Sequence, residues 1–315
     1  MKVISFEDIK RLEISPQTCI EWVSEMIANK HKVFLPPKIS IKPQNGVFCN
    51  VMPCILDQNT WGGVKVVTRY PERIPSLDSK LLLFSADGGT FLAIMDANWI
   101  TAMRTGAVAA HSIMLLAKHG FSTLGILGLG NTARAALLML ASMMPEKKFD
   151  VKLLKYNGQE VLFMERFSKY PNLRFVCVEN ANSLVKGTDV VISAVTYMPE
   201  NLCEDTCFEP GVLVVPIHTL GFTNCDLVFD KVFADDYGHV RHFKNFDKFK
   251  KLAEISDVVC GRAMGRENDE ERILAYNIGV SMHDINFAAH IYQLLENRQD
   301  VTDINLYDPT EKFWV

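Results

Sequence analysis

The spacing of apolar residues changes once within the first third of the chain. Residues 1–35 carry apolar side chains three and four positions apart, as in TCIEWVSEMIANKHKVF, which predicts helix. The pair Pro36–Pro37 stops that helix, because proline cannot continue it and favours extended geometry in the residue before it. Turns such as Asn45–Gly46 then separate short apolar segments, and Asp87–Gly89 resembles a hairpin tip. This region is therefore predicted to be β-rich, with the segments KISIKP, GVFCNVMPCIL, GGVKVVTRY, KLLLFSA and FLAIMD as its strands.

The remainder of the chain alternates between apolar strands and amphipathic helices. A long alanine-rich helix is expected over 96–118, and a last helix over about 280–297. Between them the strands TLGILGL, DVKLLKY, LRFVCV, DVVISAV and GVLVVPI alternate with the helices NTARAALLMLASMM, GQEVLFMERFSKY and NSLVKG. VFADD, a helix around FDKFKKLAEI and a charged loop at RAMGRENDEE follow. This alternation predicts an α/β protein with a doubly wound parallel sheet, preceded by the β-rich region.

Length and charge limit the class of protein. The 315 residues suffice for two domains, each with its own core. A formal net charge of −4 gives no electrostatic reason to expect nucleic acid or an anionic membrane as a partner. No apolar run reaches the roughly 20 residues of a membrane span, and the first residues lack a signal-peptide core, so we expect a cytoplasmic protein. The eight cysteines lie mostly singly among apolar residues, which predicts reduced, buried thiols and no metal site.

The segment from Gly128 to Ala133 has the pattern G-x-G-x-x-A. Gly128 allows a tight turn, Gly130 lets the backbone approach a pyrophosphate, and the small Ala133 lets the helix pack close to the strand. The N–H groups of Asn131 and Thr132 open the helix, where they would face phosphate oxygens. The pattern follows a strand and begins a β-α repeat, which is the context a dinucleotide site needs. The alternative is a tight strand-helix turn without a ligand.

The second strand of this repeat ends in Lys155 and Tyr156. An NAD-selective site generally places a carboxylate near this position to bind the ribose hydroxyls, and the sequence has none there. A lysine suits the 2′-phosphate of NADP, so we lean towards NADP over NAD. A solvated lysine at a strand end is the alternative, and it leaves the choice between NAD and NADP open.

Single cations occur in apolar or turn-bounded segments of the N-terminal region. Lys38 follows the double proline, Lys65 lies between valines in GGVKVV, and Arg104 lies in ITAMRTGA. Such cations could converge on a small carboxylate substrate, and a lysine near other cations would have a lowered pKa that suits acid/base work. The alternative for Lys65 is a solvent-exposed position, because strand residues alternate between two faces.

Several segments together resemble one family, the ornithine cyclodeaminase/mu-crystallin family. PPKISI, GGVKVV, ITAMRTGAVAAHS, GILGLGNTARA and LAEISDVVCGRAMGRENDEERILAYNIGVSMHDINFAA occur in the order found there. The resemblance implies a substrate-binding and dimerisation domain made of residues 1–118 and 286–315, and an NAD(P)-binding Rossmann domain over 119–285. It also implies a homodimer, for which the β-rich domain would supply the interface with aromatic residues such as Phe48, Trp61 and Phe84.

The same resemblance assigns roles to individual residues. Lys38 and Arg104 would bind the substrate carboxylate, Lys65 would contact the substrate and assist proton transfer, and Asp226 would act on the amine or the attacking water. The further candidates are Met52 for the substrate and Thr105, Ala194 and Val195 for the cofactor. Lys38 stands where an arginine is usual, Asn224–Cys225 replaces an Arg-Glu pair before Asp226, and His283 precedes Asp284 where glutamine or glutamate is common.

These departures leave the substrate open. We expect an NAD(P)-dependent enzyme acting at the Cα of a small amino acid or its imine, as a dehydrogenase, imine reductase or opine-type synthase. Ornithine cyclodeamination to L-proline and ammonia uses the same residues and remains an alternative. The alternative from another class is a non-catalytic NADP(H)-binding protein like mu-crystallin, against which the joint presence of Lys65, Arg104 and Asp226 argues.

Overall fold

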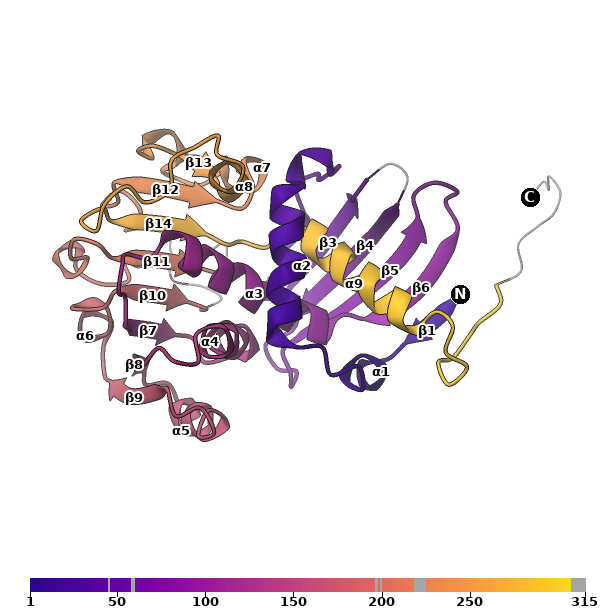
Figure 1. Ribbon diagram of the computed structural model, residues 1–315, viewed down its shortest axis with the longest axis horizontal. Helices are drawn as coiled ribbons and strands as arrows, with labels where there is room; N and C mark the ends of the chain where they lie inside the picture. Colours follow the sequence, from indigo (N-terminus) through magenta and orange to yellow (C-terminus); the bar gives the residue numbers. More distant parts are fainter. Residues whose placement is uncertain (45, 58–59, 196–197, 199, 218–224, 307–315) are drawn as a thin grey trace. The chain divides into compact units, whose positions relative to one another are not determined.

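A computed structural model describes residues 1–44, 46–57, 60–195, 198, 200–217 and 225–306 (Figure 1). Asn45 of the expected Asn45–Gly46 turn lies outside these residues. The chain divides into two compact units and passes between them four times. Unit 1 consists of Met1–Glu13, Lys32–Ile100 and Ser281–Val315, and unit 2 of Ile14–His31 and Thr101–Val280.

Unit 1 is built on a six-stranded mixed sheet in the order β1-β6-β5-β4-β3-β2. Strand β1 pairs parallel with β6, and the other neighbours are antiparallel. The helix predicted for residues 1–35 is therefore wrong at its start, because the first residues complete the edge of this sheet. The elements are β1 (Lys2–Ile4), α1 (Phe6–Lys10), β2 (Ile39–Ile41), β3 (Phe48–Ile55), β4 (Trp61–Arg69), β5 (Leu77–Ser85), β6 (Phe91–Asp96) and α9 (Ser281–Leu295).

Helix α9 packs across β3, β4 and β5 on one face of this sheet (Figure 1). Alternation in β4 directs Gly63, Lys65 and Val67 towards the helix. At Gly63 the helix comes so close that an added Cβ would lie 2.6 Å from Cδ1 of Ile285. The hairpin tip predicted between β5 and β6 is confirmed, with Gly89 at φ +72°.

Unit 2 contains an eight-stranded sheet in the order β13-β12-β14-β11-β10-β7-β8-β9, and every neighbouring pair is parallel. The chain runs outward through β7, β8 and β9 and then returns to place β10 on the other side of β7. This reversal makes the sheet doubly wound, as the alternation predicted. Its strands are β7 (Thr123–Leu127), β8 (Phe149–Leu154), β9 (Leu173–Val178), β10 (Val190–Ser193), β11 (Leu213–Pro216), β12 (Lys231–Ala234), β13 (Ala253–Glu254) and β14 (Ile273–Tyr276).

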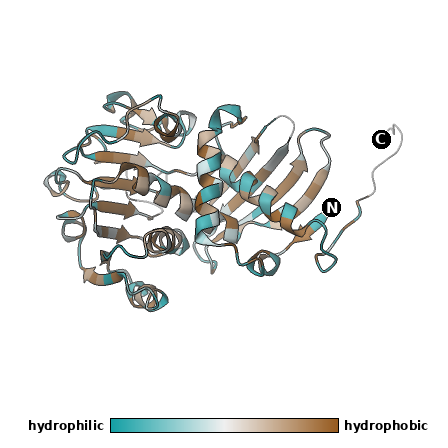
Figure 2. Ribbon diagram, in the orientation of Figure 1, coloured by the Kyte–Doolittle hydropathy of each residue, from teal (hydrophilic) through white to brown (hydrophobic). Residues whose placement is uncertain are grey.

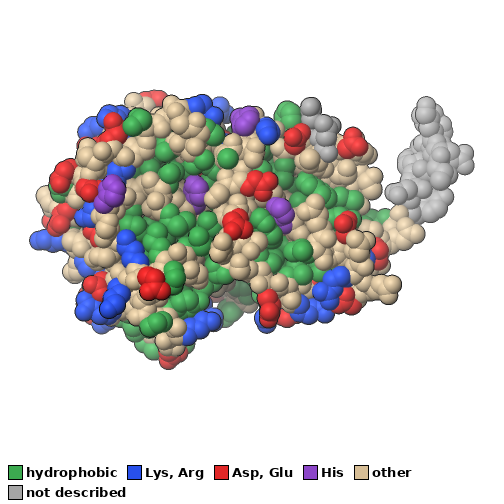
Figure 3. Space-filling model, in the orientation of Figure 1, with side chains coloured by type: hydrophobic (Ala, Val, Ile, Leu, Met, Phe, Trp, Pro, Cys, Tyr) green, Lys and Arg blue, Asp and Glu red, His purple; other side chains and the backbone are tan. Residues whose placement is uncertain are grey.

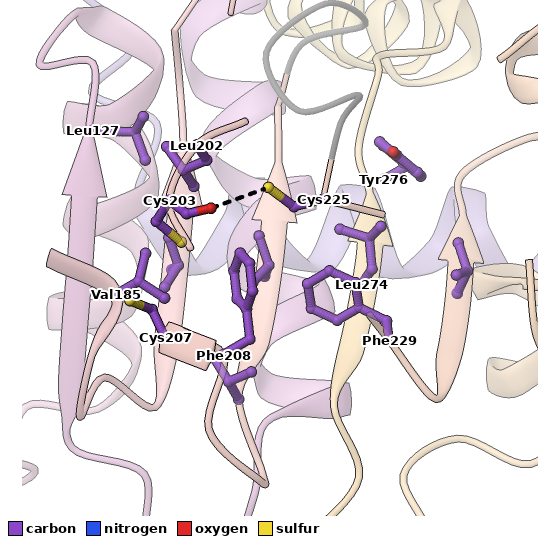
Figure 4. Close-up of a cluster of buried hydrophobic side chains, with 14 of the residues drawn as sticks. Leu127, Val185, Leu202, Cys203, Cys207, Phe208, Cys225, Phe229, Leu274 and Tyr276 are labelled. Carbon is purple, nitrogen blue, oxygen red and sulfur yellow. Dashed lines mark hydrogen bonds between the residues drawn. The ribbon is translucent and has the colours of Figure 1, made fainter. Parts of the chain in front are cut away.

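The central strands of unit 2 are mostly apolar, as expected for a parallel sheet that helices cover on both faces. Every residue of β10, β11, β12 and β14 is buried, and Figure 2 shows these strands as largely hydrophobic, with Lys231 at the start of β12 as an exception. Figure 4 shows part of the core, in which the rings of Phe208 and Phe229 meet edge to face and the Cys225 thiol lies against the carbonyl of Cys203. The helices are α2 (Pro16–Ala28), α3 (Asn98–Leu116), α4 (Asn131–Met143), α5 (Gln159–Arg166), α6 (Ala181–Val185), α7 (Tyr237–Val240) and α8 (Ile255–Val259), with α3 beginning in unit 1.

Two elements in the last part of unit 2 differ from the sequence prediction. The helix expected around FDKFKKLAEI is a single 3-10 turn at Phe246–Lys248 followed by strand β13. Pairing of β13 with β12 and packing of Phe246 and Phe249 against the core replace the helical arrangement. Strand β14 was not predicted, because only four apolar residues follow the charged segment RENDEER.

Charged side chains of both signs are scattered over the visible face of each unit, among apolar ones (Figure 3). Among the described residues, no helix has the length and apolar character needed to cross a membrane. The same residues include no group of three or more histidine, cysteine or acidic side chains arranged to hold a metal ion.

Candidate active site

The glycine turn of unit 2 follows β7 and passes directly against the end of β10. Gly128 has φ +81°, and a Cβ on it would lie 2.6 Å from the backbone C and O of Ala194. Gly130 caps α4, and a Cβ placed there would meet nothing within 4 Å. The turn thus excludes a side chain at Gly128 and leaves open space at Gly130, where backbone N–H groups can approach a phosphate. These residues fit a dinucleotide.

The strand order reverses between β7 and β10, and ligands of open α/β sheets bind at such a reversal, outside the carboxyl ends of the strands. Ala194 and Val195 follow β10 and so lie beside the glycine turn. Helix α3 packs tightly on α4, since a Cβ on Gly106 would lie 2.5 Å from the backbone of Ala135. This contact holds the neighbouring Thr105, which is buried, near the first turns of α4.

Lys155 and Tyr156 follow β8 at the same edge of the sheet. The Lys155 ammonium forms an ion pair with Glu179, which follows β9, and this hydrogen bond raises the pKa of Lys155. Tyr156 is exposed, and its N–H donates to the Glu160 carboxylate. A 2′-phosphate would therefore compete with Glu179 for Lys155, and the preference for NADP stays a prediction.

Asp226 is a buried carboxylate held by two neutral donors. Asn245 Nδ2 donates to Oδ1 at 2.6 Å, and the Tyr276 hydroxyl donates to Oδ2 at 3.3 Å. Burial raises the pKa of Asp226, although both hydrogen bonds act in the opposite direction. A carboxyl with a raised pKa is suited to general acid/base work. Asp226 was predicted from the sequence, whereas its two donors, Asn245 and Tyr276, were not.

Arg104 lies at the same end of β14 as this carboxylate. It is buried in α3, and a Cβ on Gly279 would lie 2.9 Å from its Nη1. Gly279 follows β14 with φ +83°, and its N–H donates to the Asp235 carboxylate at 2.8 Å. Because Tyr276 ends β14, Arg104 and Asp226 are both placed at the carboxyl edge of the parallel sheet.

In unit 1, Lys65 is fully buried and forms an ion pair with Asp284 of α9. Its Nζ lies 2.6 Å from Asp284 Oδ1, and both side chains are 0% exposed. The solvent-exposed alternative for Lys65 is therefore wrong, because the alternation of β4 turns this residue towards α9. A buried ion pair stabilises poorly compared with apolar residues of the same volume, so its presence suggests a functional role.

The other substrate candidates of unit 1 lie on the strands beside Lys65. Met52 is buried and stands directly opposite Lys65 in the pairing of β3 with β4. Lys38 is half-buried and immediately precedes Ile39 of β2, which pairs with Val51 of β3. No role was predicted for Asp284, and its only signal in the sequence is that it is an acidic residue within the apolar segment GVSMHDINFAA.

The doubly wound sheet, the open glycine turn and the buried carboxylate together define an α/β protein of the dinucleotide-binding class. Within that class, the chain belongs to the ornithine cyclodeaminase/mu-crystallin family, whose model matches residues 2–299. The resemblance seen in the sequence is thereby confirmed.

Relatives of this chain include an N-((2S)-2-amino-2-carboxyethyl)-L-glutamate dehydrogenase of Staphylococcus aureus, 28% identical over 92% of this chain and 94% of the relative. Among solved structures, the chain is similar to Thermococcus litoralis Delta(1)-pyrroline-2-carboxylate reductase in complex with NADH and L-proline, with TM-score 0.84, 24% identity and coverage of 96% of this chain and 100% of that one. An archaeal alanine dehydrogenase dimer with bound NAD has TM-score 0.84 and 21% identity, covering 98% of this chain and 99% of that one. Both structures share the fold of this chain.

Proposed function

We propose that this protein is an NAD(P)-dependent oxidoreductase that acts at the Cα of a small amino acid or its imine. One observation carries the proposal: Arg104 and the buried Asp226 lie at the carboxyl edge of the parallel sheet whose strand β7 ends in the glycine turn. The dehydrogenase and reductase relatives support the same reaction class. Unit 2 would bind the cofactor through Thr105, Gly128, Gly130, Asn131, Thr132, Ala133, Lys155, Tyr156, Ala194 and Val195.

Arg104 and Lys38 would hold the α-carboxylate of the substrate, and Met52 would contact its apolar part. Their contribution is orientation, which sets Cα at the correct distance and angle for the transfer. A nicotinamide cofactor held by the glycine turn would supply hydride-transfer chemistry at Cα. In the oxidative direction the amine also loses one proton, the C–N bond becomes C=N, and water then releases ammonia and leaves a 2-keto acid.

Lys65 and Asp226 would divide the charge and proton handling. Lys65 would contact the substrate, balance charge at the imine and assist proton transfer. Asp226 accepts the proton lost from the amine or from the attacking water, and its raised pKa brings it closer to the pH at which such exchange is efficient.

A cytoplasmic homodimer is the assembly that we propose. The face of the unit 1 sheet opposite α9 carries exposed apolar side chains, including Ile39, Phe91 and Ile94 at 60%, 55% and 38% exposure. An apolar sheet face of this kind suits a symmetric interface. The archaeal alanine dehydrogenase is itself a dimer. Light scattering should give twice the chain mass at micromolar concentration, and a stable monomer would contradict this assembly.

The reaction class is tested by nucleotide binding and by product analysis. NADH and NADPH are titrated by fluorescence, and L-alanine, L-aspartate, L-glutamate and L-ornithine are then incubated with each oxidised nucleotide and followed by mass spectrometry. Production of 2-keto acid and reduced nucleotide in equal amounts would support the proposal. Proline and ammonia in large excess over nucleotide would replace it with cyclodeamination. Nucleotide binding without turnover of any amino acid would favour a mu-crystallin-like binding protein.

A further inference from the structure

The segment that follows β14 lies along helix α3, which carries Arg104. The backbone N–H of Asn277 donates to the carbonyl of Pro216 at the end of β11, at 2.9 Å. The side-chain amide of Asn277 donates to Ser112 Oγ of α3 at 3.1 Å. Two residues further along, Gly279 lies against Arg104, about two turns before Ser112 on the same helix. The segment is thus tied to the sheet and to α3 beside the Arg104 guanidinium.

The contact between Gly279 and Arg104 has a specific geometry. A Cβ on Gly279 would lie 2.9 Å from Nη1, 3.2 Å from Nη2 and 3.5 Å from Cζ of Arg104. A group above the face of the guanidinium would be nearest to its central carbon. Here both terminal nitrogens are nearer than Cζ, so the Cβ would stand in front of the fork that they form. A carboxylate that accepts two parallel hydrogen bonds from an arginine must approach from this side.

Asp235 holds Gly279 in this place. Asp235 follows β12 and is buried, and its Oδ2 accepts the N–H of Gly279 at 2.8 Å. Its own N–H donates to the carbonyl of Tyr276, the last residue of β14, at 3.1 Å. Gly279 has φ +83°, a left-handed conformation that glycine adopts at no steric cost. The Asp235 carboxylate therefore fixes a residue whose backbone conformation and close contact both require glycine.

A second aspartate makes the same kind of contact at the opposite edge of the sheet. Asp230 precedes β12, and its Oδ2 accepts the N–H of Arg272, which precedes β14, at 2.9 Å. Its own N–H donates to the Arg272 carbonyl at 2.9 Å. Both aspartates thus join the same pair of strands, but Asp235 does so at the edge that carries Arg104. Asp230 therefore supplies a matched control for the structural part of the Asp235 contact.

We infer that Gly279 determines specificity for a carboxylate at Arg104 and that Asp235 is its positioning residue. Because position 279 has no side chain, a carboxylate can reach both terminal nitrogens of the guanidinium. A Cβ there would occupy the place of the carboxylate, and Asp235 keeps the Gly279 backbone from moving into it. This inference rests on the proposed function, in which Arg104 binds the α-carboxylate of the substrate, and identifies the residues that shape this subsite.

The first test compares a carboxylate with its neutral amide. Propionate and propionamide are titrated into the protein with and without NADH, and binding is followed by ligand-observed NMR. The wild type should bind propionate about 10-fold more tightly than propionamide, as expected for hydrogen bonds between charged groups. Gly279→Ala should lose this preference. Gly187→Ala should keep it, because Gly187 also has a positive φ of +65° but a Cβ there would meet nothing within 4 Å.

The second test does not depend on an added side chain and remains decisive if Gly279→Ala does not fold. Asp235→Ala should raise KM about 5-fold for an amino acid that the wild type turns over, the effect of one lost hydrogen bond, and leave kcat within about 2-fold. Asp235→Asn should restore KM, because its amide oxygen can accept the same N–H. Asp230→Ala should leave KM unchanged.

Three results would overturn the inference and leave the oxidoreductase proposal intact. These are a Gly279→Ala variant that keeps the preference for propionate, a Gly187→Ala variant that loses it equally, and equal KM changes in Asp235→Ala and Asp230→Ala. A wild type without the preference would remove Arg104 from carboxylate binding and overturn the inference as well. Failure of the proposed function appears differently, as a protein that binds neither NADH nor NADPH.

Discussion

The two units bury their charged groups in different ways. In unit 1 the Lys65 ammonium faces the Asp284 carboxylate, and neither side chain is exposed. In unit 2 the Asp226 carboxylate faces the amide of Asn245 and the hydroxyl of Tyr276, both neutral donors. In unit 1 a buried charge is thus compensated by an opposite charge in direct contact, and in unit 2 the described contacts of the carboxylate are hydrogen bonds from neutral donors.

The Lys65–Asp284 pair therefore keeps its charges, whereas the Asp226 carboxyl can gain or lose a proton. Neutralising either member of a buried ion pair leaves the other charge uncompensated, so both charges of the Lys65–Asp284 pair are held in place. Asp226 takes up a proton without breaking an ion pair, and burial already raises its pKa. The comparison therefore suggests that Lys65 supplies electrostatic stabilisation and Asp226 exchanges protons.

The largest expected effect comes from breaking the ion pair. Asp284→Ala should lower the free energy of unfolding by about 3–5 kcal/mol, because it removes the carboxylate that pairs with the buried Lys65 ammonium. Urea unfolding followed by tryptophan fluorescence measures this change, since Trp61 and Trp99 both lie in unit 1. The double variant Lys65→Met with Asp284→Leu should recover most of the loss. A loss below about 1 kcal/mol for Asp284→Ala would show that Lys65 is readily solvated, against the comparison.

Replacing the carboxylate that exchanges protons should abolish most of the activity and leave the fold unchanged. Asp226→Asn should reduce kcat by about 10²- to 10⁴-fold, the usual contribution of general acid/base catalysis, with unchanged NAD(P)H affinity. The exposed Asp247→Asn, in the same segment as Asn245, is the matched control and should retain wild-type kcat. Equal kcat values for the two variants would remove Asp226 from the mechanism.

A smaller change should appear when one neutral donor is removed. Tyr276→Phe deletes a hydrogen bond that lowers the pKa of Asp226, so this pKa should rise further above its ordinary value of 3.8. A base is active when deprotonated, and the acidic limb of the kcat profile in the oxidative direction should therefore move to higher pH. Measuring kcat against pH checks the shift, and an unmoved limb would mean that the Tyr276 hydroxyl does not influence the reacting carboxylate.

The smallest effect concerns stability. The raised pKa of Asp226 means that the folded protein disfavours its charged form. The protonated carboxyl therefore contributes to the free energy of unfolding below about pH 4, and this contribution is lost as the pH rises through the pKa of the folded state. Asp226→Asn does not titrate, and its amide can keep both contacts because a tyrosine hydroxyl also accepts hydrogen bonds. The variant should be more stable than the wild type at pH 7, and the difference should vanish below pH 4. Urea unfolding of both proteins at the two pH values measures this difference. A wild type that is more stable than the variant at pH 7 would show instead that the folded state favours the charged carboxylate.

Local patterns predicted most of the fold. Alternation of strands and helices, together with the G-x-G-x-x-A turn, was sufficient for the doubly wound sheet and its candidate ligand edge. The errors occurred where tertiary contacts override local preference, as in β13, whose pairing with β12 replaces a predicted helix. The short strand β14 fits between β11 and β12 although the four residues ILAY give no distinctive signal.

Partners of the candidate catalytic groups were much harder to predict than the groups themselves. Asn245 is 19 residues from Asp226 in sequence, Tyr276 is 50 residues away, and Asp284 is 219 residues from Lys65. Periodicity describes neighbours within one element and cannot indicate pairing over such separations. Met52 is a different case, since strand alternation in two adjacent apolar segments is consistent with its position opposite Lys65.

The position of α9 in the chain has a consequence for synthesis on the ribosome. The sheet strands of unit 1 are complete by Asp96, but the helix that covers them begins only at Ser281. At a synthesis rate of about 5–20 residues per second, Lys65 is made roughly 10 to 45 seconds before Asp284, 219 residues later. During that interval the Asp284 carboxylate that pairs with Lys65 has not yet been made, and the apolar face of the sheet that α9 covers is exposed. The growing chain is thus most vulnerable to aggregation before its last helix emerges, and this stage is where we expect chaperones to engage it.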